Sequence, residues 1–374
     1  MSDEKNQSPA TVTLERVNTA PAQTWNRLRA NDITLTVPAR SRKGDVYFAL
    51  PRLFDRVECG MGAAVTEWVV SQAEGARYVE VPRGEKRVEP VVVAIDGGAG
   101  QVADTGIMVR EGAEVTIVVA VSGGASDGTA GAETTSGSLL RVIAEAGTTV
   151  RIAEVIGVGA SHQHLESVGI SADADAHVEV SQYCLGGGTV ALGLACDLAG
   201  ARSRLDLGCR YYAAGSDVLD LNHVVRMRGR ATRAEVSESG VLDGSAKKAL
   251  RATIDLVHGA KGAKGNEAES VLVLSDDVTN KTMPTILCDE DDVAGNHGAT
   301  IGSVSPEQIA YLEDRGLSRE QAEQLFVRAL FEDAIMHAPD AASHDAALAA
   351  AARVLGDEVA HDFDDASTVS EEVA

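Results

Sequence analysis

Alternation of apolar and polar side chains dominates the chain from Val91 onward. A repeated unit starts with Gly or Asp, continues with two or three small or polar residues, and then places an apolar side chain at every second position. A period of two predicts strands with one apolar face, and no single unit can bury such a face alone. Clear units start at Gly112, Gly147, Asp175, Gly215 and Gly229. The pattern predicts a mainly β core over residues 91–304.

The spacing between the units is irregular, and this irregularity helps to distinguish two possible β architectures. A ladder of two-residue hairpins would repeat regularly, with an Asn-Gly or Asp-Gly turn at each repeat. In a β-solenoid, insertions at the corners change the spacing without breaking the stack of coils. Glycine suits such corners because it adopts positive φ angles without steric strain. The spacing therefore favours a solenoid, and a β-sandwich stays open as the alternative.

Residues 1–90 show a weaker pattern and are expected to form an irregular or helical N-terminal region. A polar arm occupies roughly the first third of this region and ends in the segment 24–28, Thr-Trp-Asn-Arg-Leu. Alternation over 33–37 predicts one strand, which Pro38 ends because proline cannot donate to a ladder. Inside the core, the Gly-, Ser-, Ala- and Thr-rich segment 123–138 predicts a flexible surface loop or a corner insertion.

The pattern changes to a helical period after residue 304. Ser305 is a suitable N-cap, because a proline follows it and Gln308 stands three residues further on. Gly316 is expected to end this helix, and Ser318 begins a second one in the same way. The apolar residues of the second helix form one stripe: Ala322, Leu325, Phe326, Ala329 and Leu330.

A third, alanine-rich helix is predicted over Ala341–Leu355, with Gly356 directly after it. These helices define an expected C-terminal helical domain over residues 305–356. The remaining segment, 357–374, is acidic and has few large apolar side chains. It is therefore expected to be a disordered tail.

Composition narrows the class of protein. The 374 residues include 37 Gly and only 3% aromatic residues, which suits short stacked strands with tight turns. A formal net charge of −23 repels nucleic-acid phosphates and anionic lipids, so neither is expected as a partner. The sequence has no apolar run long enough for a membrane span and no apolar segment typical of a secretory signal. The five cysteines are scattered, which argues against a disulfide framework and favours a cytoplasmic location.

Two histidines have the spacing most typical of a metal site. His162 and His164 are separated by one residue, so on a strand both rings would lie on one face together with Glu166. No further ligand stands nearby to complete a tetrahedral set. A solvated loop is therefore the favoured interpretation of this segment.

The spacing of the cysteines argues against a resident metal site, and the absence of common catalytic motifs argues against an enzyme. Cys184, Cys196 and Cys209 lack the C-x₂-C spacing of zinc ribbons and of iron–sulfur ligands. Cys288 lies on a predicted strand and is expected to be a small buried residue. The chain contains no P-loop and no G-x-S-x-G nucleophile elbow. We therefore expect a protein that is not an enzyme.

The most specific motif lies at the end of the predicted core. An extended, acidic run over 283–293 leads into His297-Gly298-Ala299-Thr300, and Tyr311-Leu312 and Arg315-Gly316-Leu317-Ser318 follow. This order resembles the C-terminal signature of the SufB/SufD family, the scaffold-type subunits of the SUF machine for iron–sulfur cluster assembly. The family has a C-x-A-T tetrapeptide in SufB-type members and H-G-A-T in SufD-type members, so this chain is similar to the SufD type. The resemblance is continuous over roughly a third of the chain.

The resemblance implies a fold, a site and a first partner. Members of the family have a right-handed parallel β-helix core, in agreement with the predicted solenoid. The chain would pair with a SufB-type scaffold at the end of the β-helix, where His297, Gly298 and Thr300 would face the scaffold cysteine. Because a cluster needs several ligands, one histidine cannot hold it alone. No cofactor is therefore expected to bind stably to this chain by itself, and iron or a nascent cluster would be shared at the interface through His297.

The resemblance also implies that the C-terminal helical domain docks on a SufC-type ABC ATPase. Nucleotide-driven dimerisation of that ATPase would move the helical domains and rearrange the interface near His297. The predicted docking residues lie on the two capped helices: Tyr311, Leu312, Arg315, Gly316, Leu325, Phe326, Leu330, Phe331 and Ile335. Phe331 and Ile335 are expected to be exposed anchors.

Two alternatives stay open, because the chain departs from the family pattern at several positions. Met227, for example, stands where the family has a histidine. A homomeric scaffold that works with the SufC-type ATPase alone would dimerise through its own β edge and place two copies of His297 face to face. A β-solenoid carbohydrate-active enzyme would need paired acids and usually aromatic sugar platforms, which two Trp and few aromatics do not favour.

Overall fold

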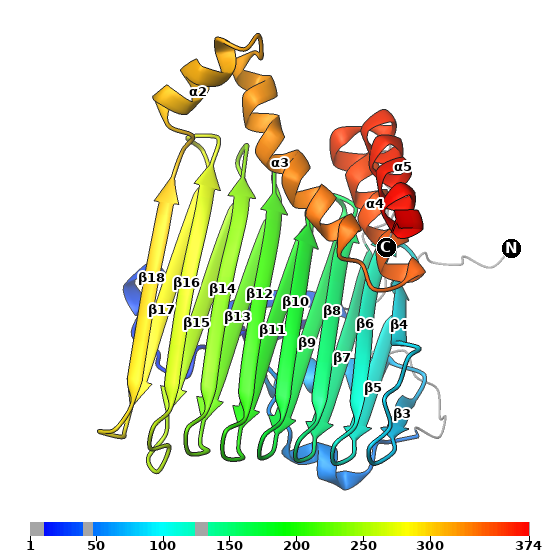
Figure 1. The fold of residues 1–374 in the computed structure, drawn as a ribbon, viewed down its shortest axis with the longest axis vertical. Coiled ribbons are helices and arrows are strands. Elements are labelled where there is room, and N and C mark those ends of the chain that lie inside the picture. Colours follow the sequence, from blue (N-terminus) through cyan, green and yellow to red (C-terminus); the bar gives the residue numbers. More distant parts are fainter. Residues whose placement is uncertain (1–10, 40–47, 124–133, 374) are drawn as a thin grey trace, which may run out of the picture.

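Two parallel sheets of eight strands face each other and form the body of the protein (Figure 1). The computed structural model describes residues 11–39, 48–123 and 134–373. The odd sheet contains β3 (Ala76–Val81), β5 (Val102–Val109), β7 (Thr134–Ala144), β9 (His162–Ala172), β11 (Thr189–Leu198), β13 (Val218–Met227), β15 (Lys247–Leu256) and β17 (Thr279–Cys288). The even sheet contains β4 (Val91–Asp96), β6 (Glu114–Gly123), β8 (Thr149–Val158), β10 (His177–Leu185), β12 (Arg204–Ala213), β14 (Arg233–Leu242), β16 (Lys264–Val273) and β18 (Ala294–Gly302).

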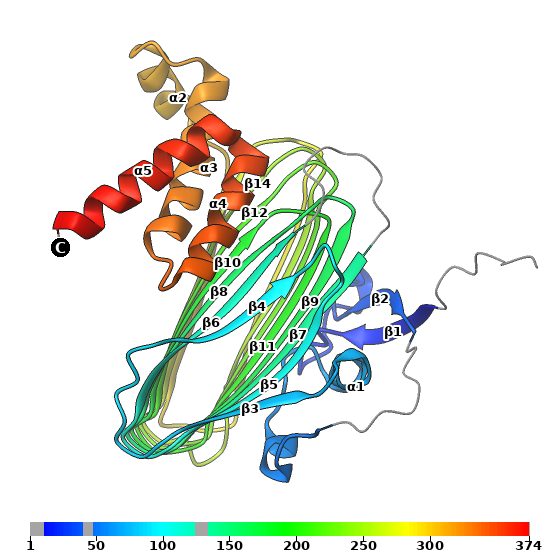
Figure 2. The same cartoon turned by 90° about the vertical axis from the view of Figure 1, so that its right-hand side faces the viewer.

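Successive strands alternate between the two sheets, so each coil contributes one strand to each of them (Figure 2). Every pairing within these sheets is parallel and in register, as between Val178 of β10 and Leu205 of β12. Paired residues on parallel strands point to the same side, so the apolar positions of successive coils stack inside the solenoid. The prediction of a mainly β, parallel solenoid is confirmed, and the all-parallel pairing excludes the β-sandwich.

Positive φ angles mark the corners that the repeated units predicted. Gly112 and Gly147 have φ values of 69° and 66°, and Asp175 takes the same conformation at 59°. At the unit that starts with Gly229 the positive φ lies at Ala231 instead. Gly229 is required for close approach, because a Cβ there would come within 2.0 Å of the Gly200 carbonyl oxygen.

The N-terminal region covers the outer face of the odd sheet (Figure 2). It contains an antiparallel pair, β1 (Thr11–Val17) and β2 (Ile33–Pro38), two short 3₁₀ helices, η1 (Asn26–Leu28) and η2 (Arg52–Arg56), and the helix α1 (Ala63–Gln72). The predicted strand before Pro38 is therefore present. The expected start of the core at residue 91 is too late, because β3 already pairs with β5. Part of the predicted polar arm forms β1, and residues 1–10 lie outside the described residues.

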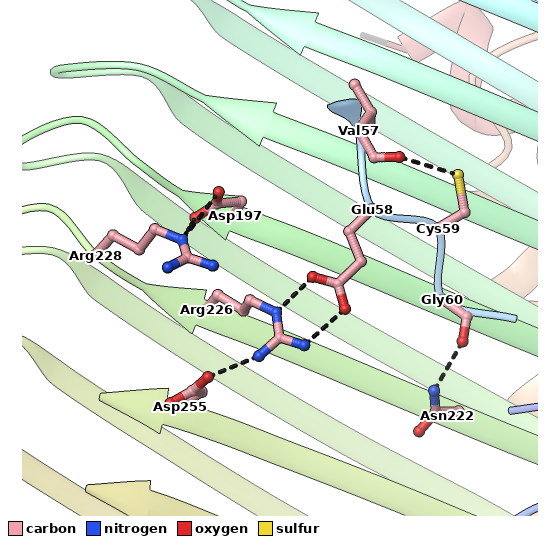
Figure 3. Close-up of polar contacts among 9 residues, drawn as sticks. All are labelled: Val57, Glu58, Cys59, Gly60, Asp197, Asn222, Arg226, Arg228 and Asp255. Carbon is pink, nitrogen blue, oxygen red and sulfur yellow. Dashed lines mark hydrogen bonds and ion pairs between the residues drawn. The ribbon is translucent and has the colours of Figure 1, made fainter. Parts of the chain in front are cut away.

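A segment between η2 and α1 holds the N-terminal region against the odd sheet (Figure 3). Its backbone lies so close to the sheet that a Cβ on Gly60 would come within 2.1 Å of the Gly193 carbonyl carbon. The Asn222 side-chain amide donates to the Gly60 carbonyl at 2.8 Å. Arg226 binds both carboxylate oxygens of Glu58 and also Asp255, at 2.7 Å.

Four helices follow the last strand: α2 (Pro306–Glu313), α3 (Arg319–Met336), α4 (Ala341–Leu355) and α5 (Asp357–Val373). Both predicted capping boxes are present, at Ser305 and at Ser318. Helix α4 packs on β6 and β8, where Gly157 lets Ala350 approach the even sheet. The prediction of a disordered tail is wrong for α5, because Phe363 is buried against α3 and α4.

The predicted loop over 123–138 is shorter than expected. β6 continues to Gly123 and β7 begins at Thr134, so the residues between them, 124–133, are the part of that prediction that lies outside the described residues. None of the helices in the described ranges combines the length and the apolar character that a membrane crossing requires.

Candidate functional site

The C-terminal end of the solenoid is an open edge. Among the described strands, β18 pairs only with β16, and β17 pairs only with β15. All nine residues of β18 are exposed, whereas the strands in the middle of the stack are buried on most positions. An edge strand of this kind presents unpaired N–H and C=O groups to any chain that approaches it. The edge is therefore the natural place for a second polypeptide to continue the sheet.

His297 lies in the middle of this edge strand. It pairs in register with Glu267 of β16 and belongs to the ladder of positions that point into the solenoid. The same ladder runs back along the even sheet from β16 to β8 through polar residues and one cysteine: Glu154, Gln182, Cys209, Glu238 and Glu267. His297 is thus the exposed last member of a ladder of polar side chains.

Gly298 and Thr300 lie on the same exposed strand. A Cβ built on Gly298 would meet nothing within 4 Å, so this chain alone does not require glycine there. Neither residue makes a side-chain contact that defines a closed site within the described chain. The three residues of the predicted site therefore share a strand and an edge, and any closed site needs another molecule.

A buried polar cluster lies behind this edge. The Tyr211 hydroxyl donates to Glu269 at 2.7 Å, and Lys248 forms a buried ion pair with the same carboxylate. His223 Nδ1 lies 3.0 Å from Glu238 Oε1. Burial, with Glu238 and Glu269 nearby, raises the pKa of Glu267 to about 8. This cluster is not among the predicted sites, although glutamates at apolar positions of the period-two pattern are a signal for it.

A second polar cluster lies deeper in the solenoid and corrects the interpretation of His162 and His164. Both histidines lie on β9 and are buried, not in a solvated loop. His164 Nδ1 is 2.8 Å from the Ser136 hydroxyl, and its Nε2 is 3.1 Å from Glu166 Oε2. Across the described part of the chain, no three His, Cys, Asp or Glu side chains are arranged to hold a metal ion. The two rings are bound by neighbouring protein groups instead.

The cysteines divide by their positions in the solenoid. Cys184 of β10 and Cys209 of β12 are buried close enough for their side chains to hydrogen-bond, whereas Cys196 lies on the opposite sheet. Cys288 is exposed at the end of β17, so the expectation that it is buried is wrong. Burial raises the pKa of Cys59 to about 11, which keeps its thiol protonated.

Comparison with known proteins decides the family. The model for "SUF system FeS cluster assembly, SufBD core domain" matches residues 92–330, which is more than half of the chain. The chain belongs to the SufBD family. The matched residues extend from the second strand of the solenoid into α3, so they include the open edge and His297.

Several known proteins are similar to this chain. The iron–sulfur cluster assembly protein SufD of Bacillus subtilis is 35% identical over 99 residues, which are 26% of this chain and 23% of that protein. A SufBD family protein of Mycobacterium tuberculosis is 27% identical over 311 residues, 79% of this chain and 73% of that protein. One of Pyrococcus horikoshii is 31% identical over 121 residues, 32% of this chain and 27% of that protein.

The predicted docking residues of this SufBD family chain divide into exposed and buried sets. Tyr311, Leu325 and Phe326 are 56%, 43% and 37% exposed. The Arg315 guanidinium lies 4.5 Å from the centre of the Tyr311 ring, and Gly316 ends the turn after α2 with a φ of 93°. Leu312 of α2 is half-buried and belongs to a small apolar cluster with Val304, Ile309 and Ala322.

Three members of the predicted docking set belong to the core of the helical domain. Leu330, Phe331 and Ile335 are buried against the even sheet and α4. Phe331 makes an edge contact with the Tyr212 ring, at 5.6 Å between ring centres. The prediction that Phe331 and Ile335 are exposed anchors is therefore wrong, because α3 lies on the sheet through that face.

Burial of Glu166 predicts a measurable dependence of stability on pH. Desolvation raises the pKa of Glu166 from 4.5 to about 8, so the folded chain holds this proton more tightly than the unfolded chain. The free energy of unfolding should therefore fall as pH rises from 4.5 to about 8, by up to about 1.4 kcal/mol per pH unit, and then level off. Glu166→Gln mimics the protonated carboxyl and should reduce this slope in urea unfolding measured across that range.

The control is Glu235→Gln, which removes an exposed carboxylate from the outer face of β14. It should leave the slope of the wild-type protein unchanged. Equal slopes for the wild type and Glu166→Gln would contradict the assignment of the proton to Glu166.

Proposed function

We propose that this chain is a non-catalytic, SufD-like subunit of a cytoplasmic iron–sulfur cluster assembly complex. The observation that carries the proposal is the fully exposed β18, which bears His297 at an unpaired sheet edge. A SufB-type scaffold would extend the two sheets at β17 and β18 and bring its cysteine opposite His297. The family match and the H-G-A-T tetrapeptide support this role.

His297 would act as one side of a site that two chains share. Imidazole nitrogen is a ligand for iron, and the exposed ring is free to meet a partner that approaches the edge. The open space around Gly298 leaves room for the partner's backbone. Iron or a nascent cluster would be the cargo of this interface, not a resident cofactor of the chain.

The helices α2 and α3 would dock on a SufC-type ABC ATPase. Their exposed apolar side chains, Tyr311, Leu325 and Phe326, are available as anchors without disturbing the packed face of α3. A groove of about 350 Å³ lies between Phe326 and the even sheet, with Ser239, Ser270 and Leu272 among the residues that line it. ATPase dimerisation would pull on α2 and α3, which follow β18 directly in the chain and so connect docking to the open edge.

The proposal is tested by purifying the full chain after co-expression with a SufB-type and a SufC-type protein. Cluster formation is followed by visible absorbance after anaerobic reconstitution. We expect a stable complex of three proteins. A complex with the ATPase alone would favour the homomeric alternative, and no complex with either protein would overturn the proposal.

In the same complex, His297→Ala should reduce the cluster absorbance substantially while the three proteins still copurify. The reason is that the substitution removes a ligand from an exposed strand without removing any packed side chain. Asn296→Ala, on the same exposed strand but outside the predicted site, is the matched control and should keep more of the signal. Equal cluster absorbance for the wild type and His297→Ala would indicate that this chain has only a structural role in the complex.

A further inference from the structure

The carboxylate of Glu267 is an unexplained group directly behind the open edge. Glu267 is only 3% exposed, yet neither of its carboxylate oxygens has a hydrogen-bond partner among the described residues. Burying a carboxylate without partners is unfavourable by several kcal/mol, whether it stays charged or takes up a proton. Because no described residue supplies a partner for this carboxylate, we infer that its partner comes from outside the chain.

The neighbouring charged groups do not serve as that partner. Lys248 is paired with Glu269 and also donates to Asn280 and Thr282, at 3.1 and 3.0 Å. His223 is paired with Glu238. Each of the other two glutamates in this cluster therefore has a basic side chain of its own, and Glu267 has none. The cluster carries one more acid than it has bases.

The position of Glu267 connects it to His297. The two residues pair in register on β16 and β18, which are neighbouring parallel strands about 4.8 Å apart, and both belong to the inward-pointing ladder. Across the interior, Gly265 of β16 faces Ile254 of β15. Two residues further along each strand, Glu267 therefore lies opposite Ala252, whose side chain is small and offers no polar group to the carboxylate.

We propose that Glu267 is a second metal-ligating residue of the edge site, and that with His297 it forms a two-residue half-site for a divalent cation of the iron(II) class. Imidazole nitrogen together with carboxylate oxygen is a ligand pair that such ions accept. A cation would supply the charge and the coordination that Glu267 lacks. Because no three ligands of this type are gathered within the described chain, the partner would complete the set. This inference rests on the proposed role of His297.

The test uses Co²⁺ as a paramagnetic probe and the full chain labelled in its histidine rings. The NMR signal of His297 is assigned by its loss in His297→Gln. In the wild-type protein, Co²⁺ should broaden this signal. In Glu267→Gln, which keeps the size of the side chain but replaces the ligating carboxyl group with an amide, the same broadening should need at least about ten times more Co²⁺. Glu235→Gln, the same substitution on the exposed outer face of β14, should behave like the wild type.

Two results would overturn the assignment. One is broadening of His297 at the same Co²⁺ concentration in the wild type and in Glu267→Gln. The other is no response of His297 in the wild type at any Co²⁺ concentration that leaves the protein folded. Thermal unfolding of each variant checks the fold, and Glu267→Gln should unfold close to the wild-type temperature because it keeps the size of the side chain. Copurification with SufB-type and SufC-type proteins is scored separately, so failure of the half-site is distinguished from failure of the proposed function.

Discussion

Arg251→Ala is expected to lower the free energy of unfolding by about 3–5 kcal/mol, because it leaves a buried carboxylate unpaired. Arg251 is 1% exposed on β15. Its guanidinium donates to both oxygens of Asp220, at 2.7 and 3.1 Å, and to the carbonyl of Ala30 in the N-terminal region, at 2.6 Å. The substitution therefore removes an ion pair inside the odd sheet and its connection to the segment that covers it. Urea unfolding followed by circular dichroism measures the change.

The matched control is Arg228→Ala on the same face of the solenoid (Figure 3). Arg228 pairs with Asp197 at 3.1 Å, but the two side chains are 48% and 30% exposed, far more than those of the Arg251 pair. An ion pair of this kind contributes about 0–1 kcal/mol. Similar losses for the two variants would show that burial of the Arg251 pair does not determine its contribution.

Phe331→Ala should destabilise the helical domain by about 3–5 kcal/mol, because it removes a fully buried ring and leaves a cavity. The ring connects α3 to Tyr212 of β12 and to the alanine-rich face of α4. Loss of the helical signal at lower urea concentration than the signal of the sheets would locate the effect. A cooperative loss of both signals at the wild-type midpoint would contradict this prediction.

Phe326→Ala is the comparison for this position, five residues earlier on the same helix. Phe326 is 37% exposed, so its removal should change stability by less than about 1 kcal/mol. If α3 docks on an ATPase through its exposed face, Phe326→Ala should weaken copurification with the SufC-type protein, whereas the fold stays intact. The opposite result, with binding indifferent to Phe326, would move the docking surface away from this face.

Local patterns were sufficient to predict the class of the core, the strands of its clearest units and the helix caps. Units such as those at Gly112 and Gly147 combine a corner residue with an alternating apolar stripe, and both signals lie within about a dozen residues. The capping boxes at Ser305 and Ser318 are likewise complete within four residues. The first strand of the solenoid was missed because it has no such stripe. In β3 only Val81 is buried, since an end coil has a neighbour on one side only.

The remaining errors depend on contacts between distant parts of the chain. Helix α5 is acidic, and its stability depends on burying Phe363 and Ala360 against other helices. The ring of His164 is bound by Ser136, which lies one coil earlier, so the sequence around His164 resembled a loop. Glu267 became a candidate only when the pairing of β16 with β18 placed it beside His297. The pairing of residues between neighbouring coils cannot be predicted from the sequence of one coil alone.

The open edge of β18 also raises the question of how the chain discriminates between partners. Backbone N–H and C=O groups are the same in every polypeptide, so they would pair as readily with a second copy of this chain as with another protein. Selectivity must then come from a difference in affinity that side chains and net charge create. A charge of −23 on each copy disfavours self-association, and a less acidic partner avoids that repulsion. The net negative charge of the chain thus disfavours pairing of two copies through the exposed edge of β18.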